Sequence, residues 1–128
     1  MMFKSILVPV DITVPGDMAK LLSRAGALKD TWGSEVHVVS VMPDPGFALV
    51  SQQLPKGLEH EARAGAKGSL QAALKEAGLS AELHIQMGTI YDQVIKLAEQ
   101  LDIDLIVIGA HQTRSVRAKQ IVLQLGPV

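Results

Sequence analysis

Four short groups of residues could contact a ligand, and each lies at the end of an apolar segment. They are residues 9–11, 41–43, 87–89 and 109–112. The first group ends in Asp11, whose carboxylate has the chemistry to bind a ribose hydroxyl or, through oxygen, a metal ion. Glycines in the last two groups let a ligand approach the backbone closely, because they carry no Cβ. These residue types favour the binding of a small polar ligand.

Each of these residues also has a structural interpretation. Asp11 is equally suited to capping the turn or helix that follows it, and glycines at positions 88 and 109 are typical of sharp turns after a strand. His111 is placed to donate to a phosphate or to satisfy a loop carbonyl. The other three histidines are His37, His60 and His84. They lack the spacing of metal ligands, so the sequence predicts no metal site.

The apolar segments that carry these groups are predicted to be β-strands. Residues 4–10 and 104–109 are continuous runs rich in branched apolar side chains, typical of central parallel strands covered on both faces. Residues 36–41 are similar, with His37 as the one polar insertion. Residues 81–86 alternate apolar and polar side chains, which predicts a strand nearer the edge of the sheet.

Segments whose apolar residues recur at helical spacing separate these strands. Apolar residues recur on one helix face within residues 18–28 and 58–77, and Gly78 follows as a helix terminator. Thr89 is the predicted N-cap of a third helix. The alternation predicts an α/β fold with right-handed crossovers and a parallel sheet. Ligands bind such sheets beyond the carboxyl ends of strands, where the strand order reverses, so we expect the four groups to converge there.

Composition excludes several classes of protein. The chain has 128 residues, enough for one domain, and its formal net charge of −1 argues against a general nucleic-acid binder. The sequence contains no run of about 18 apolar residues, so it predicts no membrane span. The absence of cysteine excludes thiol catalysis and Cys-ligated zinc. With no secretory signal in the first residues, we expect a cytoplasmic protein without membrane insertion. Standard catalytic motifs are missing, so we expect no dedicated enzyme and at most slow, incidental ATP hydrolysis.

Two further segments stand out. Residues 42–56 hold three prolines and are predicted to form a long loop, which is either functional or a surface excursion into the next helix. After Asp104 the chain has no acidic residue, whereas Arg114, Arg117 and Lys119 are basic. This charge favours an anion near the last predicted strand, or it belongs to a solvated basic loop.

Taken together, the strand segments and their ends resemble the universal stress protein family. The resemblance rests on residues 3–11 (F-K-S-I-L-V-P-V-D), 37–41, 88–94 and 102–111, the last of which contains D-L-I-V-I-G-A-H. It implies a Rossmann-like open parallel sheet of the adenine nucleotide alpha hydrolase type, with helices on both faces. It also implies a homodimer and, as in many members, a bound adenine nucleotide, ATP or AMP, with or without Mg²⁺.

The resemblance also implies which residues contact the nucleotide. Asp11 would meet the ribose or phosphate, Val41 would meet adenine through its backbone, and Gly109, Gly126 and Val128 would line the phosphate path. The full set of nucleotide-binding positions is Pro9, Val10, Asp11, Val41, Ile108, Gly109, His111, Gly126, Pro127 and Val128.

The chain departs from the family's phosphate-binding motif, Gly-x2-Gly-x9-Gly-[Ser/Thr]. Gly109 matches the first glycine, but the second position is Gln112. Gly126 resembles the third glycine at a longer spacing, and Pro127 replaces the hydroxyl residue, which removes one phosphate donor. Proline is acceptable at the first position of a helix, where no amide hydrogen is needed.

We therefore expect a single domain spanning residues 1–128 that lacks the last helix and strand of the family. The expected function is that of a stress-type regulatory protein that binds an adenine nucleotide at the carboxyl ends of the first and fourth predicted strands. The alternative is a nucleotide-independent interaction module that regulates a protein partner, such as a transporter or a metabolic enzyme, for which the departures at Gln112 and Pro127 argue.

Overall fold

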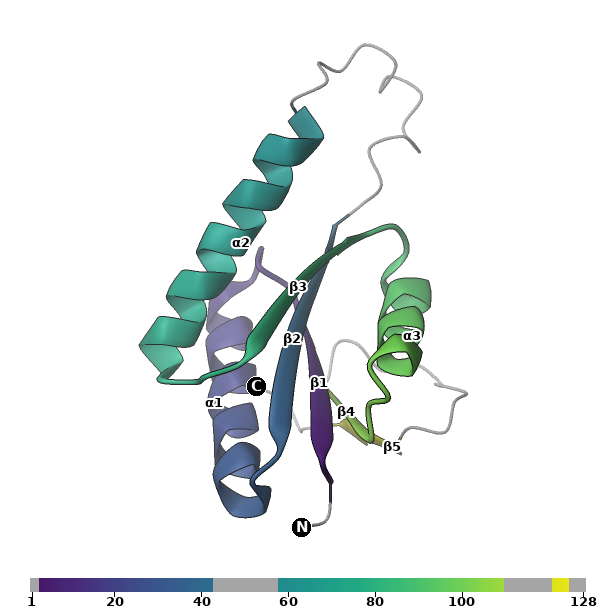
Figure 1. The fold of residues 1–128 in the computed structure, drawn as a ribbon. Helices are drawn as coiled ribbons and strands as arrows, with labels where there is room; N and C mark the ends of the chain where they lie inside the picture. The colour runs from purple at the N-terminus through teal and green to yellow at the C-terminus, as the bar shows by residue number, and fades with distance from the viewer. Residues whose placement is uncertain (1–2, 43–57, 110–120, 125–128) are drawn as a thin grey trace.

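The fold alternates strands and helices along the chain (Figure 1). The computed structural model describes residues 3–42, 58–109 and 121–124. In order, the elements are β1 (Ser5–Val10), α1 (Pro15–Trp32), β2 (Glu35–Met42), α2 (Leu58–Ala77), β3 (Glu82–Met87), α3 (Ile90–Gln100), β4 (Leu105–Ile108) and β5 (Ile121–Gln124). The predicted α/β class is confirmed, and the predicted strands and helices coincide closely with the observed ones.

The strands form one parallel sheet in the order β3-β2-β1-β4-β5. The chain builds outward from β1 through β2 to β3, then crosses back to place β4 on the other side of β1. The prediction of an edge position for β3 is confirmed. Four strands were expected from the sequence, and this count was wrong: a fifth strand, β5, only four residues long, pairs with β4 within the tail that follows Asp104.

Strand β1 lies at the centre of the sheet and is buried along its whole length. Its side chains alternate between the two faces, so that Ile6, Val8 and Val10 enter one core and Leu7 enters the other. Burial on both faces explains the continuous apolar run in the sequence, because neither face of a doubly covered strand tolerates an unpaired polar side chain.

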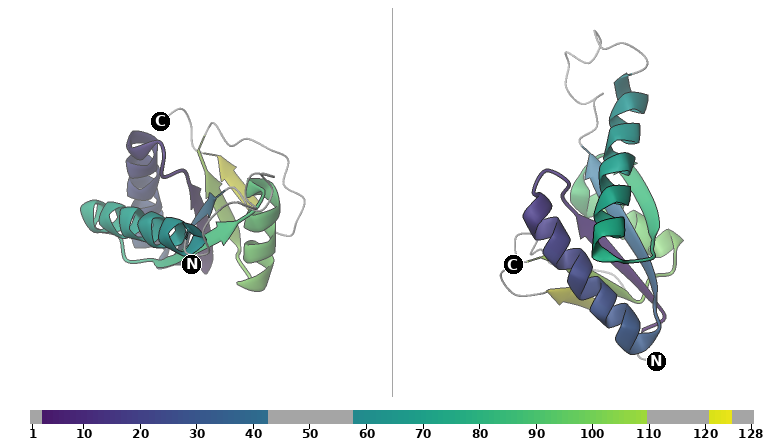
Figure 2. Two further views of the ribbon diagram at one scale, coloured as in Figure 1. Left: turned by 90° about the horizontal axis from the view of Figure 1, so that it is seen from above. Right: turned by 90° about the vertical axis from the view of Figure 1, so that its left-hand side faces the viewer.

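Helices cover both faces of the sheet, as predicted. Figure 2 shows α1 and α2 on one side of the sheet and α3 on the other. On the first side, Met18, Leu21 and Leu22 of α1 and Leu70 and Leu74 of α2 pack against the sheet. On the second side, Val94, Leu97 and Ala98 of α3 do the same. Within the described residues, no helix is both long and apolar enough to traverse a lipid bilayer.

The predicted helix boundaries have clear local causes. Gly78 has φ of 66°, and the amides of Gly78 and Leu79 donate to the carbonyls of Lys75 and Leu74, which closes α2 as expected. Thr89 occupies the predicted N-cap of α3, but its hydroxyl does not bond the helix backbone. Instead it donates to Oδ2 of Asp92 at 3.2 Å.

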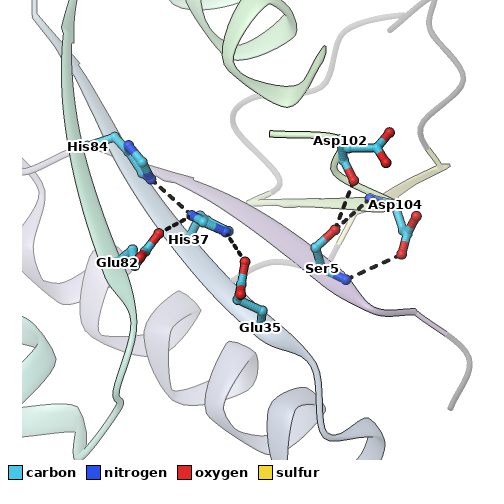
Figure 3. Close-up of polar contacts among 7 residues, drawn as sticks. All are labelled: Ser5, Glu35, His37, Glu82, His84, Asp102 and Asp104. Atoms are coloured by element: carbon cyan, nitrogen blue, oxygen red, sulfur yellow. Dashed lines mark hydrogen bonds and ion pairs between the residues drawn. The ribbon is translucent and has the colours of Figure 1, made fainter. Parts of the chain in front are cut away.

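A polar latch fixes β4 beside β1 at the amino-terminal ends of the two strands (Figure 3). Oδ2 of Asp104 accepts the amides of Lys4 at 2.8 Å and of Ser5 at 3.3 Å. In return, Oγ of Ser5 donates to the carbonyl of Asp102 at 3.1 Å, and the Asp104 amide donates to the Ser5 carbonyl at 3.1 Å. The latch therefore ties together segments about one hundred residues apart in the sequence.

Replacing Asp104 by alanine is expected to lower the free energy of unfolding by about 1–2 kcal/mol, because two backbone amides lose a charged acceptor. Urea denaturation measures this. Asp30→Ala is the matched control, since Asp30 lies exposed on α1 and its removal should change stability by less than about 0.5 kcal/mol. Equal stability of the two variants would contradict a structural role for the latch.

Candidate functional site

The carboxyl ends of β1 and β4 meet where the strand order reverses. The two parallel strands are in register at Ile6 with Leu105 and at Leu7 with Ile106. Counting on from these pairs brings Val10 level with Gly109, so Asp11 and Gly109 follow neighbouring strands at the same edge of the sheet. In an open α/β sheet this point of reversal is the usual place for a ligand.

Pro9 marks the point where β1 and β4 cease to pair. Proline has no amide hydrogen, so it cannot donate to a strand ladder. Pairing of β1 with β2 continues to Val10, whereas among the described residues pairing with β4 is recorded only at Ile6 and Leu7. A proline inside a central strand is unusual, and here it lies in β1 one residue before the carboxyl end that borders the candidate site.

Asp11 caps the turn that leads from β1 into α1. Its Oδ1 accepts the backbone amide of Thr13 at 2.9 Å and the Thr13 hydroxyl at 2.6 Å. The capping interpretation is therefore confirmed. Asp11 is also exposed, and within the described part of the chain its Oδ2 accepts no hydrogen bond. One carboxylate oxygen thus fixes the turn, and the other has no hydrogen-bond partner among the described residues. Thr13, which the sequence analysis missed, is what orients this carboxylate.

The remaining predicted site residues on the described strands lie at the same edge. Pro9, Val10 and Ile108 are buried within the sheet, and Val41 is half-buried one residue before the end of β2. Their side chains are largely enclosed, so a ligand at this edge would meet mainly their backbone. The other predicted positions lie outside the described residues and stay predictions: His111, Gly126, Pro127 and Val128.

Gly88 and Gly109 differ in whether their surroundings would accommodate a Cβ atom. Gly88 has φ of 130°, and a Cβ there would lie 3.0 Å from Nε2 of Gln93. Its amide donates to the Met42 carbonyl at 2.9 Å, which joins the ends of β2 and β3. At Gly109 a Cβ would meet none of the described atoms within 4 Å. Gly88 is therefore required by its turn, whereas at Gly109, which is buried, none of the described atoms requires a glycine.

A second polar cluster lies at the amino-terminal half of β2 and β3 (Figure 3). The register pairs His37 with Glu82, and His84 lies two residues further along β3 on the same face. Nδ1 of His37 is 3.0 Å from Nε2 of His84 and 3.2 Å from Oε2 of Glu82, and Nε2 of His37 is 2.7 Å from Oε1 of Glu35. Histidines that are scattered in the sequence are thus brought into contact by strand pairing.

The pKa of His84, one of the two histidines of this cluster, is lowered. Burial lowers the pKa of His84 below its ordinary value, because it disfavours the charged ring. The positive charge of a protonated His37 lowers the pKa of His84 further, and the Glu82 carboxylate acts in the opposite direction. His84 is therefore favoured in its neutral form, with a ring nitrogen able to act as an acceptor.

Comparison with known proteins agrees with this architecture. The sequence pattern of the universal stress protein family matches residues 2–123. The chain belongs to the universal stress protein family. Among curated relatives, Universal stress protein G of Shigella flexneri is 28% identical over 118 residues, which is 85% of this chain and 80% of the relative.

Solved structures of universal stress proteins share the fold. The protein from Archaeoglobus fulgidus in complex with dAMP superposes with a TM-score of 0.67 at 22% identity, covering 97% of this chain and 98% of that chain. A universal stress protein in complex with cAMP gives a TM-score of 0.63 at 21% identity, covering 97% of each chain. The Rossmann-like sheet expected from the sequence is confirmed.

The contrast between the two glycines is testable by alanine substitution. Gly88→Ala is expected to lower the free energy of unfolding by at least about 1 kcal/mol, because its φ is unfavourable for a residue with a Cβ. Gly109→Ala is expected to change it by less than about 0.5 kcal/mol. Both values come from urea denaturation monitored by circular dichroism. A larger loss at Gly109 than at Gly88 would show that Gly109 serves the turn.

Proposed function

We propose that this protein is a regulatory nucleotide-binding protein whose adenine nucleotide lies across the carboxyl ends of β1 and β4. The observation that carries the proposal is the reversal of strand order between these two strands, with Asp11 and Gly109 directly after them. The second carboxylate oxygen of Asp11 suits a ribose hydroxyl, and the lack of a side chain at Gly109 suits close approach of a phosphate to the backbone.

The related structures support an adenine nucleotide as the ligand. One relative was crystallised with dAMP and another with cAMP, and both share this sheet over almost the whole chain. Adenine is common to the two ligands, whereas the sugar is deoxyribose in dAMP and ribose in cAMP, and the phosphates also differ. We therefore assign recognition of the adenine nucleotide to the strand ends and leave ATP and AMP as the two candidate nucleotides, with or without Mg²⁺.

We propose binding without a dedicated catalytic reaction. Hydrolysis of a nucleotide by a side chain requires an activated nucleophile or a general base that is held by a partner. Among the described residues, the Asp11 carboxylate is hydrogen-bonded to Thr13 and to no second acid or histidine. The homodimer implied by the family resemblance and the cytoplasmic location expected from the sequence belong to the same proposal.

Nucleotide binding is tested by calorimetric titration of ATP, ADP and AMP, each with and without Mg²⁺. We expect saturable binding of at least one of them and a matching rise in the melting temperature, because a ligand that binds only the folded state stabilises it. Guanosine nucleotides are the control for recognition of the base. Absence of both heat and thermal shift at millimolar adenine nucleotide would contradict the proposal.

The role of Asp11 in binding is separable from its role in the turn. Asp11→Asn keeps an oxygen for Thr13 but removes the charge, and we expect it to weaken nucleotide binding by about 1–3 kcal/mol, measured as the change in dissociation constant. Thr13→Ala is the matched comparison: it removes one of the two hydrogen bonds that orient the carboxylate but keeps the carboxylate itself and the backbone amide, so affinity should fall by less than in Asp11→Asn. Equal loss in both variants would assign Asp11 to the turn alone.

The alternative function, a nucleotide-independent interaction module, is favoured by Gln112 and Pro127, which replace residues of the family's phosphate motif. It predicts that a protein partner is retained equally by the natural chain and by Asp11→Asn in affinity capture. Loss of the partner in Asp11→Asn together with loss of nucleotide would argue against it.

A further inference from the structure

In the cluster of Glu35, His37, Glu82 and His84, one ring nitrogen of His37 faces two further groups that can donate electron pairs. Nε2 of His37 donates to Oε1 of Glu35 at 2.7 Å, since a carboxylate only accepts. A neutral imidazole carries one N–H, so Nδ1 of His37 then presents a lone pair. That lone pair faces Oε2 of Glu82 at 3.2 Å and Nε2 of His84 at 3.0 Å. Three potential donors of electron pairs therefore converge on one point.

We propose that His37, His84 and Glu82 bind one divalent transition-metal ion of the zinc type. A proton between these atoms would satisfy only some of them, whereas a metal ion accepts an electron pair from each. Two imidazoles and a carboxylate are the ligands typical of Zn²⁺ and its neighbours, rather than of the hard ions Mg²⁺ and Ca²⁺. Water would complete the coordination, because the cluster offers three protein ligands.

The distances fit such an ion. Zinc bonds to nitrogen and oxygen of about 2.0–2.2 Å place neighbouring ligand atoms of a tetrahedral site about 3.3 Å apart. The two shorter separations here are 3.0 Å and 3.2 Å, and all three ligand atoms lie within 4.8 Å of one another. The Glu82 side chain is 70% exposed, so rotation of its carboxylate is free to close the longest separation.

Glu35 acts as the positioning residue. A histidine that binds a metal through one nitrogen commonly donates the other N–H to a carboxylate, which fixes its tautomer and its ring orientation. The hydrogen bond from His37 to Glu35 has this form. His37 is only 3% exposed, and strand pairing holds its backbone level with Glu82, so its ring is preorganised. Three residues of the cluster lie on strands β2 and β3 within their ladder, which makes the site rigid.

The site is independent of the proposed nucleotide site. It lies at the amino-terminal half of β2 and β3, whereas Asp11 and Gly109 follow the carboxyl ends of β1 and β4. Failure to bind a nucleotide would therefore leave this proposal unaffected, and the reverse also holds.

The experiment titrates the tag-free, metal-stripped protein with Co²⁺, followed by its visible absorption, and then displaces Co²⁺ with Zn²⁺. We expect one ion per chain, the absorption of a four-coordinate cobalt site, and a rise in melting temperature on binding. His84→Asn and Glu82→Gln change exposed or half-exposed ligands and should abolish or sharply weaken saturable binding without unfolding the chain. Circular dichroism checks that they are folded.

His60→Ala is the matched control, because it removes a histidine of α2 outside the cluster; it should bind as the natural chain does. Glu35→Gln should weaken Co²⁺ binding by about tenfold while leaving the stoichiometry and the spectrum unchanged. The proposal is overturned if the natural chain shows no saturable binding, if His84→Asn binds as tightly as the natural chain, or if His60→Ala abolishes binding.

Discussion

The contact between Asp104 and the backbone of Lys4 and Ser5 is the constraint on which the arrangement of this sheet depends. After β3 the chain must return across the sheet through α3 and enter β4 on the far side of β1. Recorded pairing between β1 and β4 is short, so the carboxylate and the apolar core beneath α3 hold the returning strand in register. Because the strand order reverses at this junction, the same constraint that completes the sheet also creates the candidate ligand site at its opposite end.

The sequence predicted those parts of the fold that are encoded locally. Continuous apolar runs located β1, β2 and β4, the alternation in β3 indicated an edge strand, and Gly78 ended α2 where expected. Strand β5 was missed because four residues in a basic tail give too short a pattern to distinguish from a loop. The Thr89 side chain was predicted to cap α3 but bonds Asp92 instead, a choice between two nearby partners that spacing alone does not decide.

The candidate site was predicted in its location but not in its detail. Asp11 and Gly109 follow adjacent strands, as the alternation of elements requires, yet the division of the Asp11 carboxylate between the turn and open solvent depends on Thr13, whose role only the three-dimensional contact shows. The histidine cluster depends on three-dimensional contacts even more strongly. His37 and His84 are 47 residues apart, and only the register between β2 and β3 brings Nδ1 of His37 to 3.0 Å from Nε2 of His84. Local motifs carry no information on register between strands, which is a property of the assembled sheet.

The position of β3 at the end of the sheet has a consequence for solubility. A terminal strand presents unpaired backbone groups that can template edge-to-edge aggregation with another chain. Here Nη1 of Arg63, on α2, donates to the carbonyl of Ile85 at 2.9 Å and so occupies one of the backbone acceptors of this strand. The charged Glu82 on the same strand adds a desolvation cost to any incoming β-strand. Arg63 and Glu82 therefore both oppose edge-to-edge pairing of β3 with a strand of another chain.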